Sequence, residues 1–320
     1  MDVYSAIFPV HIIFKVFGLA PININRGNKV IHCSKNLLIY NICLVLLFSS
    51  TFINIYDYLM TVTYYDETYI TLLNDCVTLY VQAVGAVVCI VLPIIYRHKY
   101  TNIINDLHYT NVIMSNLSMR ISYKNIYIYG TALTLLLLFV EIILTTTAYN
   151  VIYEKQNYYA ILNYIYIFTF PSFTNAAMKS QFETLVIILS ININCLNKYL
   201  EDLIVLSKFS ACEGIILNKI QNSRNGRDLI TTISKIYDTF VKNAQILNEI
   251  FSLQMLLFLV YDFVVILDNS YYFIYIQVTS HNEEGNKLLL SAIVICFIWD
   301  STRLCITVFI CTNFNHQVSH

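Results

Sequence analysis

Six long apolar runs dominate this chain and limit what it can fold into. They cover residues 37–57, 70–96, 126–150, 158–178, 249–276 and 288–311. At about 1.5 Å of rise per helical residue, each run is long enough to cross a hydrocarbon layer of ~30 Å. A backbone inside lipid has to satisfy its own hydrogen bonds, so the runs are predicted to be helices. The sequence therefore predicts an all-α, polytopic transmembrane helical bundle with six spans.

The composition excludes an ordinary soluble protein. Hydrophobic residues make up 57% of the chain and charged residues only 12%, which is about half the charged fraction of a typical soluble domain. The net charge of -1 argues against nucleic acid as a partner. The expected environment is the lipid bilayer.

The basic residues are distributed unevenly, and their distribution predicts the orientation. Sixteen of the 19 Lys and Arg residues lie in the N-terminal segment, in the gap after the second run and in the long gap after the fourth. The positive-inside rule places these three segments in the cytoplasm. We therefore expect a cytoplasmic N-terminal segment (1–36), a six-span bundle (37–311) and a cytoplasmic tail (312–320).

The long gap at 179–248 is itself predicted to be largely helical. Apolar residues recur at helical spacing on both of its sides, so spans four and five should continue into the cytoplasm as helices. These stripes include Leu185, Leu189, Leu196 and Leu200 on one side and Ile233, Ile236, Phe240 and Leu247 on the other. Pro171, within the fourth run, predicts a kink because its ring removes a backbone hydrogen bond.

Charged residues within the spans are candidate functional groups, because a charge in lipid is costly. Asp300 and Arg303 are spaced i, i+3, so they are predicted to neutralise each other on one helix face. Glu141 and Asp262 have no local partner. They either line a water-filled cavity and contact a ligand, or bond to a neighbouring helix.

Tyrosines in the outer part of the fourth run are further candidates. Tyr164 and Tyr166 have the aromatic faces and hydroxyls that a pocket for a small organic ligand needs. An aromatic belt at the membrane interface explains the same positions equally well, and both interpretations stay open.

No catalytic pattern stands out. The sequence lacks HExxH, GxGxxG, P-loop and GxSxG motifs. The loose group of Cys311, His316 and His320 matches no zinc spacing. We expect neither an enzyme nor a cofactor or metal site.

Three stretches of the chain stand out next to the apolar runs. Gly18-Leu19-Ala20-Pro21 precedes the first run, Gln181-Phe182 follows the fourth, and Asn248, Phe251, Ser252 and Gln254 lead into the fifth. These stretches resemble segments of the insect gustatory receptor family, and the first is similar to the family's Gly-Leu-x-Pro segment before the first span. The residues that carry the resemblance are Gly18, Pro21, Gln181, Phe182, Asn248, Phe251, Ser252 and Gln254.

The resemblance implies a taste receptor subunit of the ligand-gated cation channel type. Such a subunit is expected in the plasma membrane of a sensory neuron, in a homo- or hetero-tetramer with other receptor subunits. It implies a pocket for a small-molecule tastant in the outer half of the bundle, to which Glu141, Tyr164, Tyr166 and Asp262 are assigned.

The chain departs from the family pattern at its end. The family has a seventh, pore-lining span with Thr-Tyr followed by Gln-Phe, whereas this sequence ends at His320 without that pattern. The chain as written is therefore expected to be incomplete for conduction. Two alternatives stay open: a truncated, non-conducting regulatory subunit, and a multi-pass transporter, although no internal repeat or paired broken helices support the latter.

Overall fold

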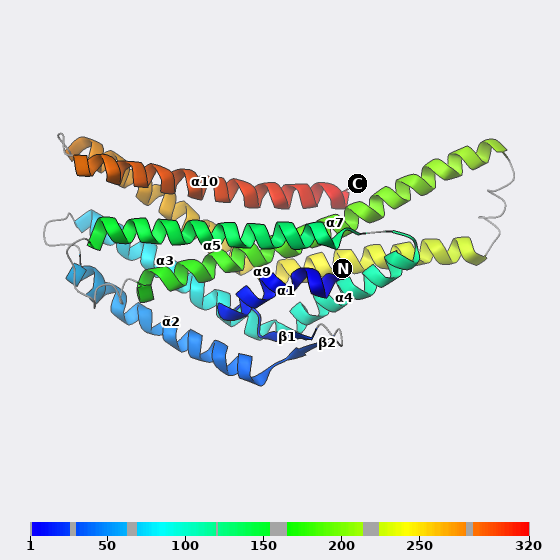
Figure 1. The fold of residues 1–320 in the computed structure, drawn as a ribbon, viewed down its shortest axis with the longest axis horizontal. Coiled ribbons are helices and arrows are strands. Elements are labelled where there is room, and N and C mark those ends of the chain that lie inside the picture. The colour runs from blue at the N-terminus through cyan, green and yellow to red at the C-terminus, as the bar shows by residue number, and fades with distance from the viewer. Residues whose placement is uncertain are drawn as a thin grey trace.

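The computed structural model is an elongated bundle of long helices (Figure 1). It describes residues 2–25, 30–62, 69–119, 121–153, 165–213, 224–279 and 284–319. The helices are α1 (Val3–Val16), α2 (Lys35–Val62), α3 (Tyr69–Ile95), α4 (Arg97–Asn116), α5 (Tyr123–Tyr153), the π-helix η1 (Ile165–Thr169), α7 (Phe170–Glu213), α9 (Arg224–Thr279) and α10 (Glu284–Ser319), and the strands are β1 (Ile22–Asn25) and β2 (Val30–Cys33).

The apolar runs form helices, as the sequence predicts. By length and composition, five helices of the described chain are able to cross a membrane, over Lys35–Ile55, Leu73–Ile95, Tyr123–Ile143, Asp228–Tyr275 and Ile293–Val318. The fourth expected run, 158–178, lies partly outside the described residues, and its remainder forms η1 and the start of α7. The helical bundle is confirmed, whereas the count of six spans stays a prediction.

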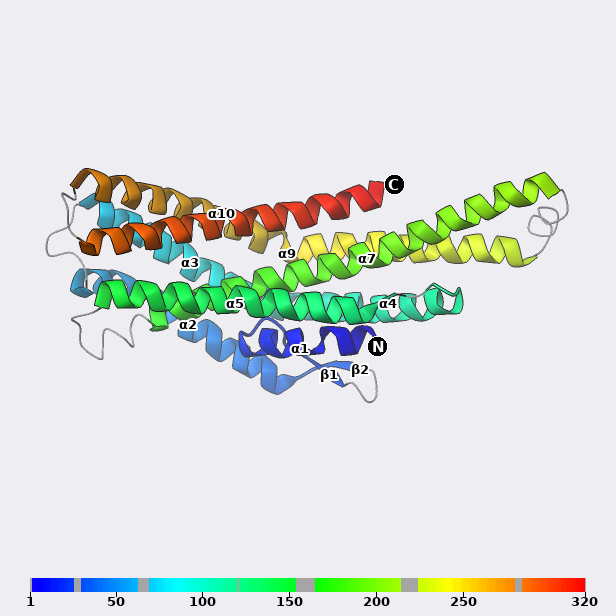
Figure 2. The same cartoon turned by 45° about the horizontal axis from the view of Figure 1, so that its top comes forward.

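The helices α7 and α9 are much longer than a membrane is thick. With 44 and 56 residues, they extend about 66 and 84 Å at 1.5 Å per residue. Figures 1 and 2 show both helices continuing past the ends of the other helices. This is the pair of helical extensions that the apolar stripes predict.

The helix ends divide into the two groups that the charge pattern predicts. The C-terminal ends of α2, α5 and α9 and the N-terminal ends of α3 and α10 lie together at the left in Figure 1. These ends flank the three gaps that are poor in Lys and Arg. That this end faces the outside is a prediction of the positive-inside rule.

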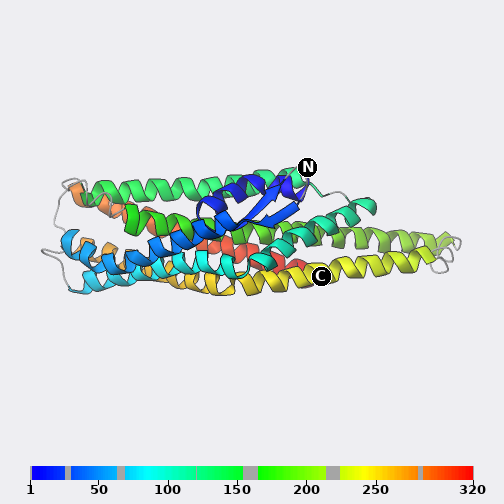
Figure 3. The same cartoon turned by 90° about the horizontal axis from the view of Figure 1, so that it is seen from below.

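The N-terminal segment contains a β-hairpin that our all-α prediction missed. β1 and β2 pair antiparallel, with Ile22 opposite Cys33 and Asn25 opposite Val30. Together with α1 the hairpin lies over one side of the bundle, beside the start of α2 (Figure 3). The apolar face of α1 is buried and includes Val3, Tyr4, Ile7, Val10 and Phe14.

A left-handed glycine ends α1 and directs the chain into the hairpin. Gly18 has φ +75°, and the Asn41 amide on α2 donates to its carbonyl at 2.6 Å. His11, buried under the hairpin, lies 3.1 Å through Nε2 from the carbonyl oxygen of Ile22. Burial lowers the pKa of His11 to about 4, so the ring is neutral at physiological pH and Nε2–H is the donor.

The helix α4 is the second element that the sequence analysis overlooked. It fills most of the basic gap after the second run, and its buried face carries Tyr100, Ile103, Ile104, Leu107 and Met114. This face packs mainly on α9 and α1. The gap after the second run is therefore largely helical, and its helix connects α9 with the N-terminal segment.

Pro171 lies one position inside α7, directly after the π-helical turn of η1. A proline removes a backbone hydrogen bond, and the wider π-helical turn accommodates this loss. The kink at Pro171 stays a prediction. The buried Gln82 amide of α3 donates to the carbonyl oxygen of Phe168 in this turn, at 3.1 Å.

Candidate functional site

Arg303 on α10 is the centre of a buried cluster of charged side chains. Its Nη1 lies 2.9 Å from Glu141 Oε1 on α5, and its Nη2 lies 2.6 Å from Asp262 Oδ1 on α9. Nη2 is also 3.2 Å from Asp300 Oδ1, one turn earlier on α10. One guanidinium therefore joins three helices through ion pairs, using the fork of donors that suits arginine to carboxylates.

Lys179 on α7 adds a fourth helix to this cluster. Its ammonium donates to the backbone carbonyl of Arg303 at 2.9 Å and lies 3.9 Å from Asp262 Oδ2. Both cations rest on the ring of Phe258 on α9, at 4.5 Å for Lys179 Nζ and 4.9 Å for the Arg303 guanidinium carbon. Such cation–π contacts are strongest where the charge is shielded from water.

Two hydroxyl groups extend the cluster along α7. Ser172 donates to Glu141 Oε2 at 2.7 Å, and Thr307 on α10 donates to Glu183 Oε1 at 2.8 Å. All four residues are buried. The cluster is thus a polar layer across the bundle, in which carboxylates outnumber cations and every charge has at least one partner.

The buried charges of the cluster restrict how α5, α7, α9 and α10 can pack against one another. A buried ion pair adds little net stability compared with apolar packing, but removing one partner leaves a charge without compensation and is costly. The four helices are therefore held in one relative position. Among the described residues, no group of His, Cys, Asp and Glu is arranged to hold a metal ion.

A second polar contact lies between α3 and α9, towards the end of the bundle at the left in Figure 1. Tyr272 donates to Asp75, with 3.1 Å to each carboxylate oxygen, and Asn74 donates to Asp268. These contacts fix α9 against α3 on the side where α9 approaches α10.

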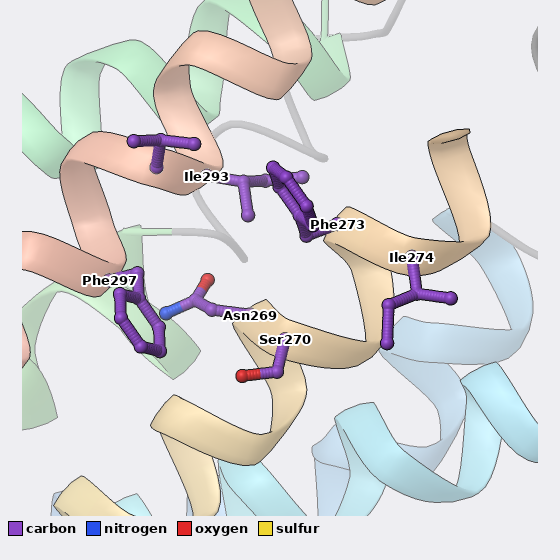
Figure 4. Close-up of a pocket in the computed structure, with 7 residues that line it drawn as sticks. Asn269, Ser270, Phe273, Ile274, Ile293 and Phe297 are labelled. Atoms are coloured by element: carbon purple, nitrogen blue, oxygen red, sulfur yellow. The ribbon is translucent and has the colours of Figure 1, made fainter.

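An apolar pocket opens between α9 and α10, next to the charge cluster. It encloses about 480 Å³, within the usual range for small-molecule sites. Figure 4 shows its lining side chains on the two facing helices. They are Asn269, Ser270, Phe273, Ile274, Ile293, Val294 and Phe297.

The pocket and the charge cluster both lie where α9 contacts α10. Asn269 follows Asp262 by two helical turns, about 10 Å along α9, and Phe297 precedes Arg303 by about 9 Å along α10. A change in the spacing of α9 and α10 at the pocket would therefore act on the helices at Arg303.

The structure brings two of the four residues assigned to ligand binding into the cluster. Glu141 and Asp262 both pair with Arg303, and Asp300 pairs with Arg303 as its spacing predicts. Tyr166 lies apart, in η1, and donates to the carbonyl oxygen of Leu47 on α2 at 2.6 Å. Tyr164 lies outside the described residues. A ligand-binding role for any of the four stays a prediction.

The three stretches with family resemblance meet within the described chain. The Gln181 amide on α7 donates to the carbonyl of Leu19 at 3.3 Å, and the ring of Phe182 packs on that of Phe251 on α9, 5.6 Å away. Gly18, Pro21 and Gln254 are buried, whereas Asn248 and Ser252 are exposed. These residues join the N-terminal segment, α7 and α9.

Sequence reasoning missed Lys179 and Asn269. Lys179 is one of the basic residues of the long gap, and its position directly after an apolar run is a signal for a charge near the membrane. Asn269 lies within an apolar run next to Asp268, and the sequence has no signal that it would face a pocket.

Comparisons with known proteins agree with this architecture. The family model described as 7tm chemosensory receptor matches residues 7–319. No curated protein sequence matches the chain. The insect olfactory receptor OR5 from Machilis hrabei has a similar fold, with a TM-score of 0.61 and 14% identity over 95% of this chain and 78% of that receptor chain. The structure of the same receptor in complex with eugenol aligns with a TM-score of 0.54 and 13% identity, over 98% of this chain and 88% of that one.

Proposed function

The chain belongs to the 7tm chemosensory receptor family, and we propose that it is a gustatory receptor subunit, a ligand-gated cation channel that detects small-molecule tastants. The proposal places the subunit in the plasma membrane of a sensory neuron, in a tetramer with identical or related subunits. The observation that carries it is an apolar pocket between α9 and α10, about two helical turns from a charge cluster that joins four helices.

This arrangement supports a receptor more than a transporter or a structural protein. A ligand changes a conformational equilibrium only if it binds the two conformations with different affinity. A pocket walled by α9 and α10 provides that difference, because a molecule between the helices favours the spacing that fits it. Arg303 then passes a displacement of α10 to Glu141 on α5 and to Asp262 on α9.

Taste rather than smell is proposed from the sequence resemblance. The Gly-Leu-x-Pro segment at Gly18–Pro21 and the two later stretches are similar to the gustatory branch of insect receptors. Their contacts, such as that of Gln181 with Leu19, give these residues a structural role in holding the N-terminal segment on the bundle.

Current recording tests this proposal. The full chain is expressed in cells, alone and with a related receptor subunit, and whole-cell currents are measured while sugars and bitter compounds are applied. We expect a ligand-evoked cation current when the related subunit is co-expressed, and Arg303→Met should strongly reduce it at equal surface expression. Ligand uptake without current would instead indicate a transporter.

A further inference from the structure

The side chains that line the pocket between α9 and α10 are complementary to one class of ligand. Seven described residues line it, and five of them have purely hydrocarbon side chains: Phe273, Ile274, Ile293, Val294 and Phe297. The Ser270 hydroxyl, one of the two polar groups, already donates to the carbonyl oxygen of Ile266 on its own helix, at 2.7 Å.

The remaining polar group is the side-chain amide of Asn269. Its Nδ2 is buried, with no hydrogen-bond partner among the described residues. Figure 4 shows the amide directed from α9 towards α10, between Phe297 and Ile293. A buried donor without a partner costs free energy that an acceptor on a bound molecule would recover.

The lining also indicates which molecules would be rejected. Among the described residues, the lining contains no ionisable side chain, so a charged ligand would lose its hydration without gaining a counter-charge there. A sugar has several hydroxyls, and one amide donor cannot satisfy them all. An acyl chain would fill the volume but would leave the Asn269 amide without an acceptor.

From these observations we propose that the pocket binds an uncharged, mainly apolar organic molecule with one hydrogen-bond acceptor, which receives the Asn269 Nδ2–H. This inference rests on the proposed function, since it names the ligand class of that receptor. It assigns recognition to α9 and α10 and makes Asn269 the residue that determines specificity.

A matched pair of probes tests the role of the acceptor. Acetophenone has one carbonyl oxygen, and α-methylstyrene has nearly the same shape with a CH₂ group in its place. Binding to the purified full chain is measured from the ligand-dependent shift in melting temperature. We expect acetophenone to bind about tenfold more tightly than α-methylstyrene, because one hydrogen bond to a buried donor is at stake, and 1-phenylethylammonium to give no shift.

Variants then assign this preference to the pocket. Asn269→Leu should reduce the tenfold preference to less than about twofold, while the matched control Ser270→Ala should keep it, because that hydroxyl is already bonded within α9. Val294→Trp, at a partly exposed lining position, should fill the cavity and abolish binding of both probes. If Asn269→Leu does not fold, Val294→Trp and the binding of the two probes to the wild-type chain still decide the question.

Each result has a defined meaning. Equal affinity of the two probes for the wild-type chain, an unchanged preference in Asn269→Leu, or full acetophenone binding to Val294→Trp would overturn the inference. A tastant-evoked current without the acceptor preference would leave the proposed function intact and remove this ligand class. If the chain prefers acetophenone but passes no ligand-evoked current, the ligand class stands and the proposed channel function is refuted.

Discussion

Arg303 offers the sharpest test of how the bundle is held together. Arg303→Met keeps most of the side-chain volume but removes the cation that pairs with Glu141, Asp262 and Asp300 at 2.9, 2.6 and 3.2 Å. The side chains of these three acidic residues are at most 9% exposed. In the variant, the nearest remaining cation is Lys179, at 3.9 Å from Asp262.

The expected loss of stability is large. Removing one partner of a buried ion pair costs about 3–5 kcal/mol. With an unfolding entropy of ~2.1 cal/mol/K per residue, a chain of 320 residues has about 0.7 kcal/mol/K, so the melting temperature should fall by about 4–7 °C. The assay is thermal unfolding of the purified full chain in detergent, followed by circular dichroism of the helices.

Two controls separate burial from charge. Lys99→Met removes a cation from the pair with Glu249, whose side chains are 40% and 50% exposed, and should change the melting temperature by no more than about 1.5 °C. Neutralising the cluster's carboxylates in the Arg303→Met background, with Glu141→Gln, Asp262→Asn and Asp300→Asn, should recover part of the loss. The reasoning is refuted if Arg303→Met melts within 1 °C of the wild-type protein, or if neutralisation brings no recovery.

Two further predictions concern the N-terminal segment. Because burial lowers the pKa of His11 from 6.5 to about 4, the unfolded chain takes up a proton before the folded chain does. Stability should be constant above about pH 6.5 and fall by about 3 kcal/mol as the pH drops to 4, and in denaturant titrations His11→Gln should lack this fall. Gly18→Ala should cost at least about 1–2 kcal/mol, because residue 18 has φ +75° and the added Cβ would lie 2.9 Å from Leu44 Cδ1; an unchanged midpoint of unfolding would contradict this.

The parts of the fold that depend on local pattern could be predicted from the sequence. The apolar runs gave the long helices, and the i, i+3 spacing gave the pairing of Asp300 with Arg303. The stripes on either side of the long gap gave the extensions of α7 and α9. Each of these depends on residues within a few helical turns of one another, where spacing alone determines which side chains share a face.

Contacts between distant segments could not be predicted in this way. Glu141 and Arg303 are 162 positions apart. The sequence shows Glu141 without a local partner but does not indicate that it meets Arg303. The Asn269 amide faces the pocket because of how α9 is rotated against α10. With a single sequence, nothing links positions across helices, so the charge cluster and the pocket required the structure.

The β-hairpin and α4 were missed although their signals were present. Ile22-Asn23-Ile24-Asn25 alternates apolar and polar residues, as a half-buried strand does, and a glycine-containing segment separates it from Val30-Ile31-His32-Cys33. In α4, the apolar residues follow a helical period. Both elements are short or only weakly apolar next to the six long runs, so the charge pattern and the run lengths alone do not indicate them.

The position of the charge cluster explains why a receptor would retain it. Apolar side chains of similar volume would hold α5, α7, α9 and α10 together at least as strongly, but they would also tolerate small sliding motions of one helix past another. Ion pairs of 2.6–3.2 Å around Arg303 are lost when the helices shift by a few ångströms, so they favour discrete arrangements of the bundle over continuous ones. Under the proposed function, a ligand bound about two helical turns away, between Asn269 and Phe297, would act on a bundle that changes between discrete arrangements instead of bending gradually. A weak binding energy would then be sufficient, because the ligand would only have to shift the balance between such arrangements.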